Sequence, residues 1–297
     1  MKSVQPLNKS DFLESNDVRE FVEWLSHILP RLKIRFEVKA SKSCPNGLNK
    51  TVYGLEEATK NYNWKSSWKD KNGNSVDSCD WPSTKKSLNK LSDWLKETIE
   101  SKDNMDLLNA CQAVLDWGGV QGALEYVKTE AKAGNLVIYL KSKQTSLTLD
   151  QANLPIRDVP KYDSGMTKIH SLASNDGLPI YDSRVGAAVS GLVALYCSSR
   201  NKKISTNLRF LTGAARGGQI RDPSKLGYSH SSSFTYSNSG AIRWMECQVK
   251  CGWILSEFLR KTRLYAKEGD ISARMHALEA GLFMIGYDVR TFLDPKK

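Results

Sequence analysis

The chain has 297 residues, of which 40% are hydrophobic, and it carries a formal net charge of +11 at pH 7. This length and composition are sufficient for one large folded domain or two small ones. No stretch approaches the roughly 18 consecutive apolar residues of a membrane span, so we expect no membrane association. The first residues lack the apolar core of a secretory signal, which predicts a cytoplasmic protein. The positive charge suits a polyanionic partner, most simply nucleic acid, and the alternative is a basic surface that binds none.

Cysteine spacing gives no metal site. Six cysteines occur, at positions 44, 79, 111, 197, 247 and 251. In the cytoplasm most are expected to be buried thiols. Cys247 and Cys251 would share one face of a helix, but no second pair and no nearby histidine completes a zinc site.

The first half of the chain predicts helices around a polar stretch. Helical periodicity is expected over residues 10–29, 54–62, 84–101, 104–117 and 120–133. Ser10 or Asp11 is the expected cap of the first helix. Residues 34–38 alternate like a short strand, and residues 65–79 are expected to form an exposed loop.

Aromatic residues are scattered through the polar stretch, at Tyr53, Tyr62, Trp64, Trp68 and Trp81. Aromatic side chains among basic residues can stack on nucleic-acid bases. The irregular spacing here favours packing in a small cluster.

The second half predicts three more helices after residue 182. Residues 167–173 form a short helical run, which Asn175-Asp176-Gly177 interrupts. Residues 178–181 are expected to be extended because Pro179 disfavours helix at the residue before it. Further helices are expected from residue 183, over 242–265 and over 272–285, with loops at 213–223 and 229–239. The fold class is therefore mainly α with little strand, either as two parts, 1–104 and 105–297, or as one continuous domain.

Lys168 and Asp182 lie fourteen positions apart, one on a helix and the other at the start of the next. Asp182 is well placed to cap the second helix, because its carboxylate can accept hydrogen bonds from free backbone N–H groups. This arrangement predicts that both side chains face one cleft. A cap also fixes the position of a carboxylate, which a catalytic group requires.

The chain contains two short motifs, each followed by a helix: Gly165-x-Thr167-Lys168 and Pro179-Ile180-x-Asp182. This order resembles the helix-hairpin-helix DNA glycosylase superfamily, and within it the bacterial branch similar to 8-oxoguanine DNA glycosylases. The family hairpin usually holds two glycines where this chain has one. The resemblance implies a helix-hairpin-helix glycosylase-like fold, a catalytic lysine at Lys168 and a catalytic aspartate at Asp182. Some relatives carry a four-cysteine iron–sulfur cluster, but its spacing is absent here, so we expect no metal and no cofactor.

The resemblance predicts a monomer that binds double-stranded DNA, flips out a modified base and cleaves its N-glycosidic bond. Expected DNA-binding residues are Gly165, Thr167, His170, Arg184, Arg216, Gly217 and Arg221. A structural ion pair is an equal alternative for Arg184, and a surface turn is an equal alternative for the loop that holds Arg216, Gly217 and Arg221. Two kinds of substrate remain possible. One is an oxidised purine. The other is a modified cytosine of phage DNA, such as glucosylated hydroxymethylcytosine, whose removal would serve antiviral defence. The rival hypothesis is a helical DNA-binding protein without catalytic activity.

Overall fold

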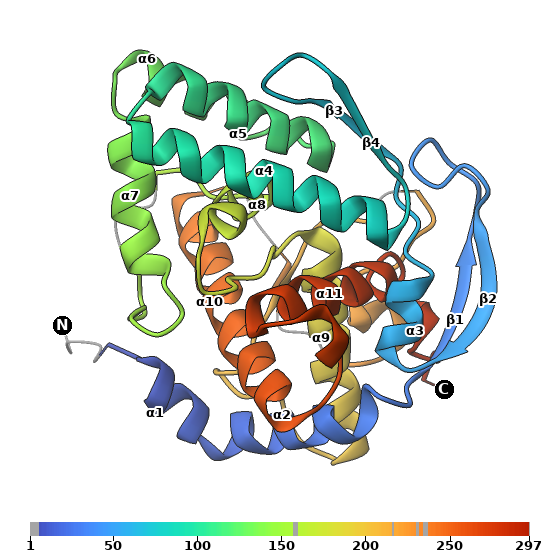
Figure 1. Ribbon diagram of the computed structural model, residues 1–297. Helices are drawn as coiled ribbons and strands as arrows, with labels where there is room; N and C mark the ends of the chain where they lie inside the picture. Colours follow the sequence, from blue (N-terminus) through green and yellow to red (C-terminus); the bar gives the residue numbers. More distant parts are fainter. Residues whose placement is uncertain (1–5, 157–159, 216, 230–231, 234–236, 297) are drawn as a thin grey trace.

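The structure is a computed structural model that describes residues 6–156, 160–215, 217–229, 232–233 and 237–296 (Figure 1). Within these ranges it contains 11 α-helices, which with short 3₁₀ turns make the chain 56% helical, and three two-stranded sheets. The expected mainly α class is confirmed. None of the helices in the described ranges is long and apolar enough to cross a membrane.

The helices are α1 (Lys9–Glu14), α2 (Asn16–Ile28), α3 (Leu55–Lys60), α4 (Trp81–Ser101), α5 (Asn104–Gly118), α6 (Leu124–Lys132), α7 (Leu136–Leu147), α8 (Ser164–Ala173), α9 (Ser183–Ser199), α10 (Asn238–Lys261) and α11 (Ile271–Ile285). The strands are β1 (Lys33–Val38), β2 (Leu48–Tyr53), β3 (Ser66–Lys69), β4 (Ser75–Ser78), β5 (Leu211–Thr212) and β6 (Ser232–Ser233). Strands β1 and β2 pair antiparallel, as do β3 and β4, whereas β5 and β6 pair parallel.

Aspartate caps fix the starts of the main helices. The side chains of Asp80, Asp103, Asp163, Asp182 and Asp270 accept backbone N–H groups at the starts of α4, α5, α8, α9 and α11. A carboxylate at this position accepts hydrogen bonds from the free N–H groups of the first turn, and its negative charge interacts favourably with the positive end of the helix dipole.

Three expectations from the sequence are wrong in detail. The helix expected over residues 10–29 is divided at Ser15, whose backbone is extended, and its first part is capped by Asn8 instead of Ser10 or Asp11. The loop expected at residues 65–79 is the β3–β4 hairpin, which forms because Trp68 is buried and donates its indole N–H to Ser87 Oγ at 3.2 Å. Residues 136–147, which are not among the helices expected from the sequence, form α7.

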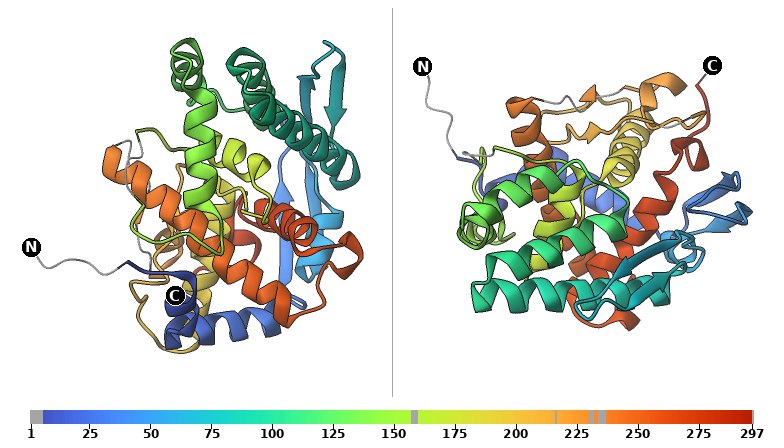
Figure 2. Two further views of the ribbon diagram at one scale, coloured as in Figure 1. Left: turned by 60° about the vertical axis from the view of Figure 1, so that its left-hand side comes forward. Right: turned by 90° about the horizontal axis from the view of Figure 1, so that it is seen from above.

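One hydrophobic core extends from Phe12 to Leu293. Helices α4 and α5 lie side by side as one layer, with the β3–β4 hairpin at its edge, and α9, α10 and α11 occupy the centre of the molecule (Figures 1 and 2). Helix α3 packs on α11 and α2 packs on α10, so elements on either side of residue 104 share this core. The division near residue 104 stays a prediction.

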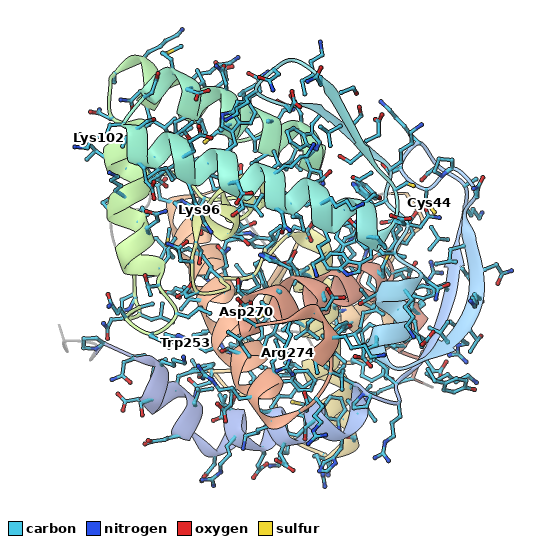
Figure 3. The ribbon with its side chains drawn as sticks, in the orientation of Figure 1. Cys44, Lys96, Lys102, Trp253, Asp270 and Arg274 are labelled. Carbon is cyan, nitrogen blue, oxygen red and sulfur yellow. The ribbon has the colours of Figure 1, made fainter. Side chains whose placement is uncertain are left out.

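The junction of α10 and α11 fixes where α11 lies. Arg274, labelled in Figure 3, donates from α11 to the carbonyl oxygens of Leu259 and Leu264 at 2.8 Å, near the end of α10. Trp253 on α10 is fully buried and donates its indole N–H to Leu149 O at 2.6 Å. These bonds hold α10 against its neighbours and place α11 beside α9, where the candidate site lies.

Candidate functional site

The segment from α8 to α9 builds the centre of the site. Asp163 starts α8, and the helix ends at Ala173. Residues 174–182 have no regular secondary structure, as expected for the stretch around Pro179. Asp182 then starts α9. The connection therefore returns the chain so that the start of α9 meets the middle of α8.

Lys168 and Asp182 meet across this connection. Lys168 Nζ lies 3.4 Å from Asp182 Oδ2 and donates to Ser164 O at 3.2 Å. Asp182 Oδ1 accepts the backbone N–H groups of Arg184 at 2.9 Å and Val185 at 3.0 Å. The helix-cap prediction for Asp182 is confirmed, and so is the prediction that the two side chains face each other. Both are buried, with 4% of Lys168 and 8% of Asp182 exposed.

Asp182 is held in its charged form. Burial by itself would raise the pKa of Asp182, but the charge of Lys168, the backbone N–H of Val185 and the charge and N–H of Arg184 together lower it. Each carboxylate oxygen thus has its own partner. The result is a buried, ionised carboxylate whose orientation is fixed by the helix it caps.

The pair borders a cavity of about 110 Å³. Its walls come from the segment before β3, from α4, from the end of α5, and from α8, α9 and α11. Five aromatic residues line it: Tyr62, Trp64, Trp81, Trp117 and Phe283. Of these, Tyr62, Trp64, Trp81 and Phe283 pack against one another at centroid distances of 5.5–6.2 Å. The cluster packing expected for the aromatic residues of the polar stretch is thereby confirmed for Tyr62, Trp64 and Trp81. Trp68 is buried without a ring contact to this cluster, and Tyr53 is 62% exposed.

The turn after α5 forms one wall. Gly118 lies against the stem of Lys168, so closely that a Cβ at this position would be 2.6 Å from Lys168 Cδ. Gly119 follows with a left-handed backbone, φ +61°. Trp117 Nε1 is buried and has no hydrogen-bond partner among the described residues. Since an indole N–H only donates, an acceptor on a ligand would satisfy it.

Sequence reasoning did not identify a second carboxylate of the cavity, Glu279 on α11. It is 7% exposed, and its Oε2 accepts the backbone N–H of Ile180 at 2.7 Å. Burial raises the pKa of Glu279, against the lowering effects of His276 and the Ile180 N–H. The sequence does contain a signal for this residue, because Glu279 is the one charged residue in the otherwise apolar run 277–285.

Helix α8 buries three residues that were expected to contact DNA. Gly165 and Thr167 are inside the core, and a Cβ on Gly165 would lie 2.8 Å from Leu115 Cδ2. His170 stacks on Tyr162 at 5.3 Å, and burial lowers its pKa to about 3. All three are buried in packing roles that leave no side-chain surface for a phosphate, so we no longer expect them to contact DNA.

Two arginines of the expected DNA-binding set are also buried at the cavity. The Arg184 guanidinium packs on Trp64 at 4.1 Å and Phe283 at 4.2 Å, and burial lowers its pKa to about 10. Arg221 donates to Ser183 Oγ at 2.6 Å and to Ala214 O at 3.0 Å. Both side chains line the cavity, where they add positive charge beside Asp182.

The glycine-rich loop lies next to this cavity. Gly217 has a left-handed backbone, φ +59°, with open space around it, and it lines a separate groove that also holds Arg290. Gln219 borders both this groove and the cavity. Arg216 lies outside the described residues, as do residues 230–231 and 234–236 of the loop at 229–239. Within the described ranges, no three His, Cys, Asp or Glu side chains gather in a metal-binding group.

No known family model, curated protein or solved structure matches this chain. The function is therefore inferred from the chemistry of the cavity and from the motif resemblance.

Proposed function

We propose that the protein is a DNA glycosylase, which flips a modified base into the cavity and cleaves its N-glycosidic bond. The observation that carries the proposal is the buried Lys168–Asp182 pair, 3.4 Å apart, at the edge of an aromatic-walled cavity. The motif resemblance supports the same chemistry. The net charge of +11 is compatible with binding to a polyanion such as DNA.

Asp182 has the properties that glycosidic cleavage requires. As the bond between C1′ and the base breaks, positive charge develops on the sugar, and a fixed carboxylate stabilises that charge most strongly in a water-poor site. Asp182 is ionised, and two backbone N–H groups hold it in place. It therefore needs no reorganisation when the sugar becomes cationic.

Lys168 is the proposed nucleophile. Lys168, whose charge stabilises Asp182 at rest, first gives a proton to the departing base. Its neutral amine then attacks C1′, a new C–N bond forms, and the electron pair of the broken bond leaves with the protonated base. Asp182 accepts the proton that the amine releases, because it lies 3.4 Å from Nζ. Opening of the sugar ring then gives a Schiff base, which water hydrolyses. If water attacks in place of the amine, Asp182 takes the proton of the water molecule.

The cavity is suited to a single flipped ring. Its volume of about 110 Å³ is of the same order as the ~150 Å³ cavity that admits one benzene ring. Aromatic walls can stack on a base that has left the helix. The same bond cleavage serves two settings: repair of oxidised purines, and defence by removal of a modified cytosine, such as a glucosylated one, from phage DNA. The second ring of a purine, or the added sugar, must then extend beyond this volume.

The test is incubation of the protein with duplexes that each carry one modified base, with released bases identified by mass spectrometry. We expect release from at least one duplex and not from unmodified DNA. Asp182→Asn should reduce release by about 100-fold or more, while DNA binding persists, because asparagine also caps helices.

Lys168→Gln separates the two nucleophiles. Wild-type protein should form a borohydride-trapped adduct with substrate DNA, and Lys168→Gln should not. A fully active Lys168→Gln variant, together with no adduct in wild type, would assign attack to water. DNA binding without release of any base from a wide panel would favour the non-catalytic protein.

A further inference from the structure

We propose that Gln248 on α10 is the positioning residue that sets the distance between Lys168 and Asp182. Its side-chain amide holds helix α8, which carries Lys168, and at the same time the connection that leads to Asp182. Gln248 is fully buried and is not among the residues that line the cavity, so it acts through the reacting pair and not on the substrate. The proposal rests on the glycosylase function and adds a residue to its machinery.

The amide of Gln248 uses both its donor and its acceptor. Nε2 donates to the carbonyl oxygen of Thr167 at 3.1 Å and to that of Pro179 at 2.7 Å. Oε1 accepts the hydroxyl group of Tyr162 at 2.5 Å. Because carbonyl oxygens only accept, this orientation of the amide is the one that satisfies all three partners.

The three partners lie on both sides of the turn between α8 and α9. Tyr162 lies just before α8, and Thr167 is the residue directly before Lys168. Pro179 lies in the connection, shortly before Asp182 starts α9. One side chain is therefore bonded to the backbone on each side of the Lys168–Asp182 contact, and movement of one side relative to the other breaks a hydrogen bond.

The connection depends on side chains for its position. Residues 174–182 have no regular secondary structure, so neither a helix nor a sheet fixes their backbone. Glu279 Oε2 accepts the N–H of Ile180, and Gln248 donates to the carbonyl oxygen of Pro179. Among the described residues, that carbonyl oxygen accepts no other hydrogen bond. Loss of the amide would leave it buried without a partner, which favours a shift of the connection.

The close approach of α10 supports the same role. Gly252 follows Gln248 by about one helical turn. A Cβ at Gly252 would lie 3.0 Å from Pro179 Cδ and 2.5 Å from Leu149 Cδ2. The missing side chain lets the backbone of α10 reach the connection close to the point where Gln248 binds it.

Gln144 offers a matched comparison for a purely structural role. Its Nε2 donates from α7 to the carbonyl oxygen of Ala173, the last residue of α8, at 2.8 Å. It therefore also binds α8 from a neighbouring helix, but it does not bind the connection. Methionine at position 144 or 248 keeps an unbranched side chain of similar volume and removes the amide.

The experiment measures base release in single turnovers, with protein in excess over a duplex that wild type cleaves, and the Kd for that duplex. Thermal unfolding identifies a temperature at which every variant is folded. We expect Gln248→Met to release the base about 10- to 100-fold more slowly, because a misplacement of about 1 Å can cost a catalytic step about 100-fold. Its Kd should stay within about threefold of wild type, and Gln144→Met should keep both the rate and the Kd within about threefold.

The pH profile of the rate is a readout that lost stability alone would not move. Lys168 lowers the pKa of Asp182, so separation of the pair raises that pKa. The acid limb of the profile should therefore lie at higher pH in Gln248→Met and stay in place in Gln144→Met. Tyr162→Phe removes the hydroxyl group that holds Oε1 of Gln248, and it should slow release by about 3- to 10-fold.

Two results would overturn the role of Gln248 and leave the glycosylase function in place. One is a folded Gln248→Met variant whose rate and acid limb match those of Gln144→Met. The other, which applies even if Gln248→Met fails to fold, is a Tyr162→Phe variant that releases the base at the wild-type rate. A wild-type protein that releases no base from any duplex would instead overturn the glycosylase function, and with it the role of Gln248.

Discussion

Gly118→Ala is a direct test of whether the position of Lys168 matters. The added methyl group would lie 2.6 Å from Lys168 Cδ and 2.7 Å from Cε, where ordinary contacts begin at about 3.4 Å. The stem of Lys168 must therefore shift by about 0.8 Å. A misplacement of about 1 Å can cost a catalytic step about 100-fold. We expect Gly118→Ala to reduce base release and adduct formation by about 10- to 100-fold.

The same change should not destabilise the protein. Gly118 is the last residue of α5, and alanine is favoured over glycine in a helix by up to about 1 kcal/mol. Gly119→Ala is the matched control. Nothing lies within 4 Å of a Cβ at Gly119, but its φ of +61° strains any side chain, at a cost of about 1–2 kcal/mol. We expect this variant to lose stability and, when folded, to keep its activity.

The assay pairs thermal unfolding with borohydride trapping on one substrate duplex. We expect opposite patterns: Gly118→Ala should be stable but impaired in base release, and Gly119→Ala should be less stable but active. A Gly118→Ala variant that forms adduct at the wild-type rate would refute it, because the lysine would then reach C1′ from a displaced position.

Two further predictions concern the arginines and the buried histidine. Arg216→Ala should lower the slope of log affinity for DNA against log salt by about one, and an unchanged slope would exclude a phosphate contact at this residue. Arg221→Ala should leave that slope unchanged. It should lower the free energy of unfolding by about 2 kcal/mol, because the Arg221 guanidinium is buried on Ser183. His170 should make the protein acid-sensitive. Its pKa falls from 6.5 to about 3 on folding, so the unfolded chain binds the proton first and stability declines as pH falls from about 6.5 towards 3. The decline reaches at most about 1.4 kcal/mol per pH unit. His170→Gln should remove this component, and urea unfolding at pH 4 and pH 7 measures it.

Local sequence signals determined the helices and one half of the site. Periodic apolar residues and aspartate caps are properties of neighbouring residues, which is why most helices, and the cap at Asp182, could be predicted. The interval between Lys168 and Asp182 also contains its own turn signals, Asn175 to Gly177 and Pro179. The contact between Lys168 and Asp182 therefore depends on a local segment of about twenty residues.

Only the tertiary structure decided which residues surround that pair. Glu279 reaches the cavity because α11 packs beside α9, almost one hundred residues after Asp182, and no local pattern reports such a contact. The same packing determined whether the arginines are exposed or buried. Arg184 and Arg221 look like exposed phosphate ligands in the sequence. In the structure the aromatic rings of the distant Trp64 and Phe283 cover Arg184, and Arg221 is held by Ser183 and by the nearby Ala214 carbonyl. Burial depends on what a distant segment places against a side chain, and for this reason the sequence predicted Lys168 and Asp182 but not Glu279 beside them.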